Sequence, residues 1–331
     1  MEFDRPHIEY DAYDKIILFF SGGKDSVMCY LELLEMGVKP EKIELHHHLI
    51  DGKEGSTLMD WPITESYCKA FGKAFGSEVF FSWRIGGFER EMLRDNDPTA
   101  AIKFEDKDHN IVLAEGRLKN PPLGTRQKFP QVSSDLSTRW CSSYLKIDVG
   151  DRLIRRQFRF NGDRKYLVIT GERAEESAAR AKYKEFETHR SYIDGKRAKR
   201  LIYHARIVKN ASEKQVWDLL KKYNVNPHPA YHAGWGRTSC LTCIFGSADQ
   251  WATVAKYMPE HFDKISKYEQ QFETTIHRTM SVIEQAERGK PYNVEPDVYR
   301  LAMSKDYTEN IILTGGWELP KGAFGDSSGP T

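Results

Sequence analysis

Short apolar runs and helical spacings of apolar residues alternate along the first hundred residues of the chain. The apolar runs predict buried strands at 15–20, 43–50 and 78–83. Apolar residues three or four positions apart predict helices at 26–36, 63–75 and 88–94. Strands separated by helices favour a parallel sheet, because each helix carries the chain back across the sheet.

The pattern is interrupted between residues 95 and 139 and then resumes. The interrupting stretch is polar and contains four prolines, which predicts a long insertion or lid. Beyond it we predict a helix near 142–157, strands at 166–170 and 202–208, and a helix after the capping box SEKQ at 212–215. Residues 249–289 again have helical spacing, with a break at Pro259.

This alternation predicts one fold class and three regions. We expect an α/β protein with a doubly wound, mainly parallel, Rossmann-like sheet and a helical C-terminal part. Residues 1–225 would form the α/β domain, including the insertion, and residues 226–314 a cysteine-containing helical region. Residues 315–331 are rich in Gly, Pro and Ser and have no periodicity, which predicts a loose tail.

Composition narrows the classes of protein to which this chain can belong. Hydrophobic residues make up 40% of the 331 residues, enough for a large core, and no apolar stretch approaches the roughly 20 residues of a membrane helix. The N-terminal sequence MEFDRPHIEYDAYD is acidic and unlike a signal peptide. Five cysteines, an odd number, favour a reducing cytoplasm over a disulfide framework. We therefore expect a cytoplasmic protein without membrane attachment.

Charge is balanced overall and uneven locally. The formal net charge is only +1, so the chain as a whole does not indicate a nucleic-acid partner. Residues 190–209, however, hold seven Lys and Arg against the single Asp194, and residues 152–165 are also basic. These stretches either form a solvated surface or offer a polyanion such as nucleic acid a place to bind.

The sequence SGGKDS follows the first predicted strand and opens the first predicted helix. This order places free backbone amides and a helix N-terminus at the carboxyl edge of the sheet, where anions bind. The two glycines permit close approach of a phosphate, the serines can donate hydroxyls, and the lysine adds a positive charge. The Walker and dinucleotide glycine patterns are both absent. The candidate phosphate-binding residues are Ser21, Gly22, Gly23, Lys24, Asp25 and Ser26.

SGGKDS resembles the PP-loop of the ATP-pyrophosphatase superfamily, in the lysine-containing form of the phosphoadenosine-phosphosulfate (PAPS) reductase family. TGERAEESAARA at 170–181, directly after a predicted strand, is similar to that family's second phosphate-side motif. The resemblance implies an adenine nucleotide alpha hydrolase-like fold that binds ATP and Mg²⁺ and cleaves between the α and β phosphates. It implies catalytic roles for Lys24, Asp25 and Arg173, and nucleotide contacts from Gly171, Arg173, Glu176 and Arg180.

Individual residues of the second motif suit this chemistry. Arg173 and Arg180 offer forked cations to phosphate oxygens, while Glu175 or Glu176 could hold a metal ion or orient an arginine. HHHLIDG at 46–52 also matches the family pattern, which implies that Asp51 lies near the nucleotide. The three histidines alternate between the two faces of a strand, so they cannot form one metal-ligand cluster by themselves.

Three of the five cysteines lie in stretches that resemble the same family, STRWCSSYLKI at 137–147 and WGRTSCLTCIFG at 235–246. Such thiolates hold iron–sulfur clusters in that family, which implies a [4Fe–4S] site at Cys141, Cys240 and Cys243 with a fourth ligand from elsewhere. A zinc site completed by a histidine such as His232 and a metal-free C-x-x-C are the alternatives. Cys29 and Cys68 lie among apolar residues of predicted helices and are expected in the core.

The cysteine pattern departs from that of the sulfonucleotide reductases. A single cysteine stands where those enzymes carry a Cys-Cys pair, and no cysteine follows Cys243 to act as a nucleophile on a mobile tail. The chain is more similar to the ATP-pyrophosphatase component of bacterial DNA phosphorothioation systems. That resemblance implies adenylylation with release of pyrophosphate, sulfur insertion, a cysteine desulfurase as sulfur donor and a nucleic acid substrate. A PAPS reductase and a non-catalytic nucleotide-binding subunit are the alternatives.

Overall fold

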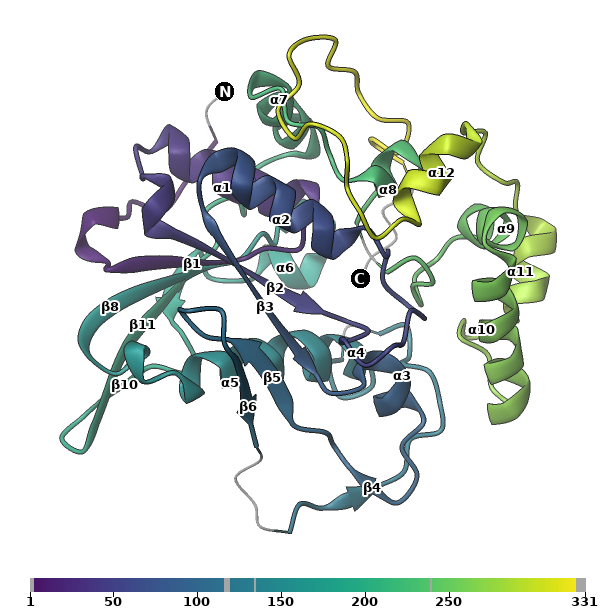
Figure 1. Cartoon of the computed structure of the whole chain (residues 1–331), viewed down its shortest axis with the longest axis horizontal. Coiled ribbons are helices and arrows are strands. Elements are labelled where there is room, and N and C mark those ends of the chain that lie inside the picture. Colours follow the sequence, from purple (N-terminus) through teal and green to yellow (C-terminus); the bar gives the residue numbers. More distant parts are fainter. Residues whose placement is uncertain (1–2, 116–119, 134, 239, 326–331) are drawn as a thin grey trace.

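The computed structural model describes residues 3–115, 120–133, 135–238 and 240–325 (Figure 1). Its centre is a mixed, mostly parallel sheet with the strand order β10-β11-β8-β1-β2-β3-β5-β6, and β9 pairs with β11. The α/β class and the mainly parallel sheet predicted from the sequence are confirmed. The parallel strands are β1 (Lys15–Phe19), β2 (Ile43–Leu49), β3 (Glu78–Arg84), β8 (Gly162–Ile169) and β11 (Ala198–Ala205).

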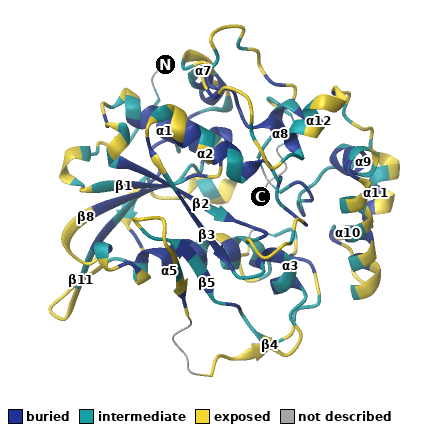
Figure 2. Ribbon diagram, viewed as in Figure 1, coloured by how far each residue is buried: buried dark blue, intermediate teal, exposed yellow. Residues whose placement is uncertain are grey.

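Helices cover both faces of the sheet because the side chains of each buried strand alternate between the faces. Ile16 and Leu18 of β1 belong to one buried cluster with residues of α1, α2 and α7, while Ile17 packs with Ile154 of α5 on the other face. Figure 2 shows the buried central strands between these layers. The four helices are α1 (Lys24–Glu35), α2 (Thr64–Phe75), α5 (Asp148–Arg156) and α7 (Glu213–Lys222).

Short antiparallel strands extend both edges of the sheet, and on one side they come from the predicted insertion. The pair β5 and β6 continues the sheet beyond β3, so residues 95–139 are not simply a polar lid. Ile102 and Phe104 of β5 are fully buried, but two alternating positions in a proline-rich stretch are too few to predict a strand. The short strands are β4 (Asp97–Pro98), β5 (Ile102–Glu105), β6 (Ile111–Ala114), β7 (Leu123–Gly124), β9 (Phe186–Thr188) and β10 (Ile193–Gly195).

The remaining helices lie mainly in the C-terminal part, as the helical spacing there predicts. They enclose a second core around Trp61, Trp140, Trp235 and Trp251. The predicted break at Pro259 is confirmed: α9 ends at Tyr257, and Pro259 occupies the first position of α10, where its missing N–H costs nothing. The helices are α3 (Gly87–Met92), α4 (Trp140–Ser142), α6 (Ala178–Ala181), α8 (Pro229–His232), α9 (Ala248–Tyr257), α10 (Pro259–Phe272), α11 (Val282–Arg288) and α12 (Pro296–Ala302). A π-helical turn, Ser143–Ile147, joins α4 to α5.

The C-terminal tail differs from the sequence prediction. The indole N–H of Trp317 donates to the carbonyl of Val225 at 2.8 Å, and the amide of Gly322 donates to the carbonyl of Tyr231 at 2.8 Å. A single tryptophan thus attaches a Gly- and Pro-rich segment that has no periodicity of its own. Residues 326–331 of the predicted loose tail lie outside the described residues. No helix in the described part of the chain is long and apolar enough to cross a membrane.

Candidate functional site

The order of the parallel strands marks one place where a ligand is expected. From β1 the chain crosses to β2 and then β3 on one side, whereas β8 and β11 lie on the other side of β1. The direction of the crossovers therefore reverses between β1 and β8, and open α/β sheets bind ligands outside the carboxyl ends of the strands at such a point. SGGKDS follows β1 and GERAEES follows β8, so both motifs stand at this position.

The SGGKDS loop is held in shape by its own serines. Ser26 Oγ donates to the carbonyl of Gly23 at 2.9 Å and accepts the amide of Ser21 at 3.2 Å. Gly22 has a φ of +77°, and a Cβ there would lie 3.3 Å from both Cys68 Sγ and the Tyr67 ring. The position therefore requires glycine for its conformation and for its space.

The first turn of α1 lies next to the second motif. A Cβ on Gly171 would lie 3.0 Å from the carbonyl carbon of Asp25 and 3.2 Å from the amide nitrogen of Ser26. The amides of a helix's first turn have no partner within the helix. Glycine at 171 therefore allows the β8 segment to come close without a side chain that would cover these donors, and they remain suited to an anion.

A buried ion pair joins the two motifs. Arg173 Nε donates to Asp25 Oδ1 at 2.5 Å, and Arg173 Nη1 donates to Glu175 Oε2 at 2.6 Å. The arginine side chain is only 3% exposed. Burial disfavours its charged form, but Asp25 more than compensates, so the pKa of Arg173 lies above its usual range. Arg173 therefore fixes the orientation of Asp25 in this structure.

Glu175 and Glu176 of the second motif orient arginines. Glu176 accepts the backbone amide of Arg173 at 2.9 Å and forms an ion pair with Arg180, one helical turn further on. Glu175 also accepts the amide of Glu213 at 2.8 Å, at the beginning of α7. Of the two roles that the sequence leaves open for these carboxylates, metal binding or orienting an arginine, the structure shows the second.

Lys24 connects the loop to the C-terminal region. Its ammonium donates to the carbonyl of Gly236 at 2.9 Å and lies 3.5 Å from Glu213, and its side chain is 2% exposed. The hydroxyl of Tyr231 accepts the Lys24 amide at 2.9 Å and the Thr238 amide at 3.3 Å. Sequence reasoning missed Tyr231, because nothing local relates it to a loop 207 residues away.

Asp51 lines a cavity of about 510 Å³ beyond the carboxyl end of β2. Its Oδ2 accepts the amides of Met59 at 2.9 Å and Asp60 at 2.8 Å, whereas its buried Oδ1 has no hydrogen-bond partner among the described residues. Burial raises the pKa of Asp51 to about 7. Thr64, also in the cavity wall, lies 3.3 Å from His228, which is next to Gly22, so the cavity neighbours the loop.

The three candidate thiols lie near one another although about a hundred residues separate Cys141 from the C-x-x-C pair. Burial and the neighbouring Cys243 raise the pKa of Cys141 to about 11, and burial and Cys243 also raise that of Cys240. Across the described residues, however, no three His, Cys, Asp or Glu side chains are grouped closely enough to hold a metal ion. Cys29 and Cys68 are fully buried, as predicted.

The histidines considered as metal ligands have other polar contacts. His232 Nε2 lies 3.0 Å from Asn226 Oδ1. The three histidines of β2 have separate partners: His46 contacts Glu44, His47 the Phe20 carbonyl and His48 Ser82. The prediction that they form no common ligand cluster agrees with this arrangement.

Arg139 is a further site residue that sequence reasoning missed. Its Nε and Nη1 are buried and have no hydrogen-bond partner within the described part of the chain. Its pKa is lowered by burial and by the nearby Arg180 and Arg237, an effect that Cys141 opposes. Arg139 is therefore near Arg180 of the second motif, Arg237 and Cys141. Arg139 stands two residues before Cys141, and this position is the sequence signal that could have identified it.

Comparison with known proteins adds a likeness but no activity. No protein-family model matches the chain. It is 25% identical over 265 residues to an uncharacterised 37.8 kDa protein in the gpa 5′ region of Escherichia phage 186, a match that covers 76% of this chain and 74% of the phage protein. The argument for function therefore depends on the geometry of the site.

Proposed function

We propose that this protein is a PP-loop ATP pyrophosphatase of the PAPS reductase family, which cleaves ATP to AMP and pyrophosphate and transfers the adenylyl group to a substrate. The observation that supports it most directly is the 2.5 Å hydrogen bond from Arg173 to Asp25. This bond joins the two phosphate-side motifs across the switch point of the sheet, where a nucleotide is expected. Each motif alone is only a short sequence pattern. That the fold brings the two motifs into contact is a separate observation, because it does not follow from either pattern.

The residues present fit a nucleotide triphosphate with a divalent cation. The Lys24 amide is bonded to Tyr231, so the next two amides of α1, those of Asp25 and Ser26, would receive a phosphate, and the arginines of the second motif supply positive charge beside it. Asp25 Oδ1 binds Arg173, and its Oδ2 lies 4.0 Å from the Lys24 ammonium. Mg²⁺, when bound with ATP, neutralises phosphate charge, and Asp25 is the residue that would hold it. Lys24 would act from within the loop, through its contact with Gly236.

The three thiols suggest that the adenylylated substrate then receives sulfur. We propose that an oxygen of the substrate attacks the α phosphorus and pyrophosphate leaves. The terminal sulfur of a persulfide formed by a cysteine desulfurase later displaces AMP, and a second thiol then cleaves the S–S bond, which leaves sulfur on the substrate and a disulfide between the two thiols. Cys141, Cys240 and Cys243 would hold a [4Fe–4S] cluster in this scheme, with Zn²⁺ as the alternative. DNA is the proposed substrate class, as in phosphorothioation systems.

The products of ATP cleavage test this proposal. Purified protein with Mg²⁺ and ATP labelled at the α and γ positions should yield AMP and pyrophosphate. Production of ADP and phosphate would contradict cleavage between the α and β phosphates. Nucleotide binding without turnover would indicate a non-catalytic subunit, and thioredoxin-dependent release of sulfite from PAPS would indicate a reductase.

Lysine substitution at Arg173 or Arg180 should lower ATP affinity at least several-fold. Lysine keeps the positive charge but cannot make the forked contacts that Arg173 makes to Asp25 and Glu175 at once. Titration calorimetry with ATP measures the effect, and Arg300→Lys, at an exposed ion pair on α12, is the matched control. Wild-type affinity in both variants would show that these arginines only stabilise the fold and do not contact the nucleotide.

A further inference from the structure

The two basic stretches of the sequence meet on one surface. β8 and β11 pair in parallel, with Arg200 beside Gly162, so their amino ends are adjacent. Arg155 Nε donates to Ser191 Oγ at 3.1 Å, and Arg200 Nε donates to Asn161 Oδ1 at 3.1 Å, which holds the stretches together. Residues 152–165 contain six Lys and Arg and residues 190–200 five, against two aspartates. We call this region the amino-edge surface.

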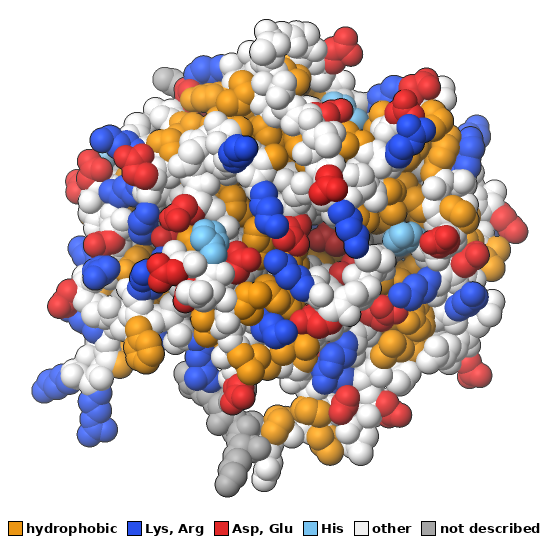
Figure 3. Space-filling model, in the orientation of Figure 1, with side chains coloured by type: hydrophobic (Ala, Val, Ile, Leu, Met, Phe, Trp, Pro, Cys, Tyr) orange, Lys and Arg blue, Asp and Glu red, His pale blue; other side chains and the backbone are white. Residues whose placement is uncertain are grey.

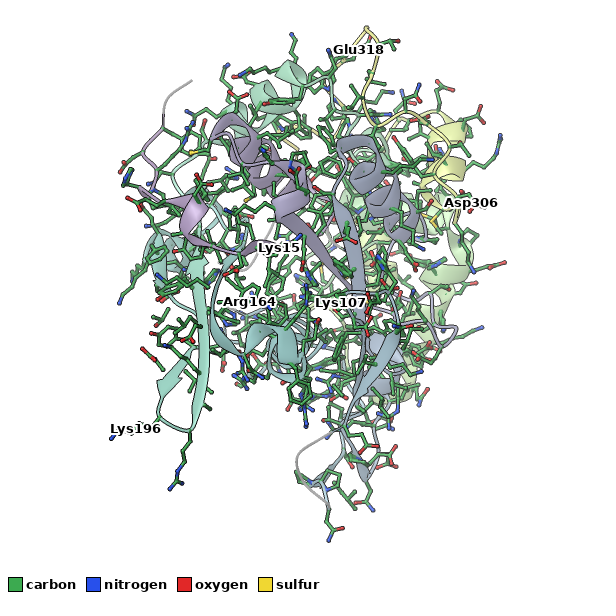
Figure 4. The ribbon with its side chains drawn as sticks, turned by 60° about the vertical axis from the view of Figure 1, so that its left-hand side comes forward. Lys15, Lys107, Arg164, Lys196, Asp306 and Glu318 are labelled. Atoms are coloured by element: carbon green, nitrogen blue, oxygen red, sulfur yellow. The ribbon has the colours of Figure 1, made fainter. Side chains whose placement is uncertain are left out.

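A hairpin projects from this surface. β10 and β11 pair antiparallel around the turn at Gly195 and Ala198, and residues 193–198 are all exposed. Figures 1 and 4 show the hairpin standing away from the body of the protein, with Lys196 at its tip, and Figure 3 shows basic side chains at the same place. Several cations of the amino-edge surface have acidic partners: Arg155 and Arg190 lie 3.7 and 3.8 Å from Asp151, Arg159 lies 2.7 Å from Glu44, and Lys199 lies near Asp163 and Asp194. The cations that remain exposed include Lys196 and Arg197 at the hairpin tip and Arg156 at the end of α5.

An exposed aromatic ring accompanies these cations. Phe158 is 91% exposed, the highest value among the exposed large hydrophobic residues of the described chain, and it follows the arginines at the end of α5. A ring in this position contributes nothing to the core, since Phe160 of the same turn is fully buried and fills that role. Aromatic rings among cations are typical of surfaces on which unpaired bases stack.

This surface is at the opposite edge of the sheet from the nucleotide site. β8 runs from Gly162 at the amino-edge surface to Ile169, directly before the second motif, and eight residues of strand span about 26 Å. The basic residues nearer the site are neutralised, since Arg206 pairs with Glu187 and Lys209 with Glu185. Nucleotides bound at the amino edge would therefore not be the ones that react.

We propose that the amino-edge surface binds single-stranded nucleic acid, with phosphates on Lys196, Arg197 and Arg156, and a base stacked on Phe158. It would serve as a holding site about 26 Å from the chemistry. The choice of nucleic acid as the partner rests on the proposed function. Binding at the surface, however, does not require ATP cleavage. Nucleic acid is favoured over an anionic membrane because one isolated ring gives little apolar area for insertion.

Fluorescence anisotropy with a labelled 20-nucleotide oligo(dT) and a 20-base-pair duplex, without ATP, tests the surface. The double variant Lys196→Glu/Arg197→Glu should bind either probe at least tenfold more weakly, with a shallower salt dependence. Phe158→Ala should weaken oligo(dT) binding by about tenfold and leave duplex binding within twofold, because only unpaired bases stack. The matched control is Lys267→Glu/Arg300→Glu, two exposed cations of the C-terminal helices.

The outcomes separate this inference from the proposed function. Wild-type protein that binds neither probe at low salt, or charge reversal without effect, would overturn the inference. Binding to vesicles of phosphatidylserine but not to oligonucleotides would overturn it in favour of a membrane surface. Protein that binds oligo(dT) but forms no pyrophosphate contradicts the proposed function alone, and the reverse result contradicts the amino-edge surface alone. The hairpin variant should retain wild-type ATP turnover.

Discussion

Replacement of Asp25 by asparagine should lower pyrophosphate release from ATP by at least about a hundredfold, roughly 2.7 kcal/mol of transition-state stabilisation. Asparagine keeps the volume and one acceptor for Arg173, which donates to Asp25 Oδ1 at 2.5 Å. It removes the negative charge that would hold Mg²⁺ and that balances a 3%-exposed arginine. The rate of pyrophosphate formation, measured with a coupled phosphatase assay, reports the change.

Two controls make this result interpretable. Asp163→Asn removes a carboxylate paired with Lys199 at the opposite edge of the sheet and should leave turnover unchanged. Thermal unfolding of Asp25→Asn shows whether the fold survives, because loss of a partner from a buried ion pair is itself destabilising. A folded Asp25→Asn variant with wild-type turnover would place the active site elsewhere.

Serine at Cys141, Cys240 or Cys243 should abolish the colour of anaerobically purified protein. Wild-type protein is expected to be brown, to absorb broadly in the visible range and to contain iron, as proteins with thiolate-bound iron–sulfur clusters do. Burial raises the pKa values of Cys141 and Cys240, so these thiols are protonated without a metal, and metal binding would have to release their protons. Visible absorption and iron analysis of each variant measure the loss.

The two core cysteines supply the comparison. Cys29 of α1 and Cys68 of α2 are fully buried in one hydrophobic cluster. Serine at either position should therefore leave the colour unchanged, even if it lowers stability. Colourless wild-type protein with one zinc per chain would replace the cluster by a structural zinc site. Protein without either metal would leave Cys240 and Cys243 as a plain dithiol.

The sequence by itself determined the class of fold and the local form of the SGGKDS loop. Apolar runs such as 15–20 are buried on both faces of the sheet, and a central parallel strand needs nothing more than such a run. The turn at Gly22 is equally local, because its φ of +77° depends on the residue type. The SEKQ capping box likewise stands where predicted, with Ser212 and Gln215 bonded to each other's backbone amides.

The structure of short or aperiodic segments depends on their packing against the rest of the chain. β5 has only four residues, and its burial depends on the edge of β3 that it joins. The tail is attached through Trp317 to the carbonyl of Val225, 92 residues earlier in the chain. Neither segment has enough residues to set up a period that could be recognised before the partner surface is known.

The tertiary structure alone decided which residues meet. Arg173 is 148 residues from Asp25, and Gly236 is 212 residues from Lys24; both contacts exist because the strand order places β8 beside β1 and brings the C-terminal region over the loop. The same order places residues 152–165 and 190–200 at the amino edge, away from the proposed nucleotide site. The spacing of apolar residues shows which face of each segment is buried. The strand order depends instead on which of these buried faces pack together over the whole chain.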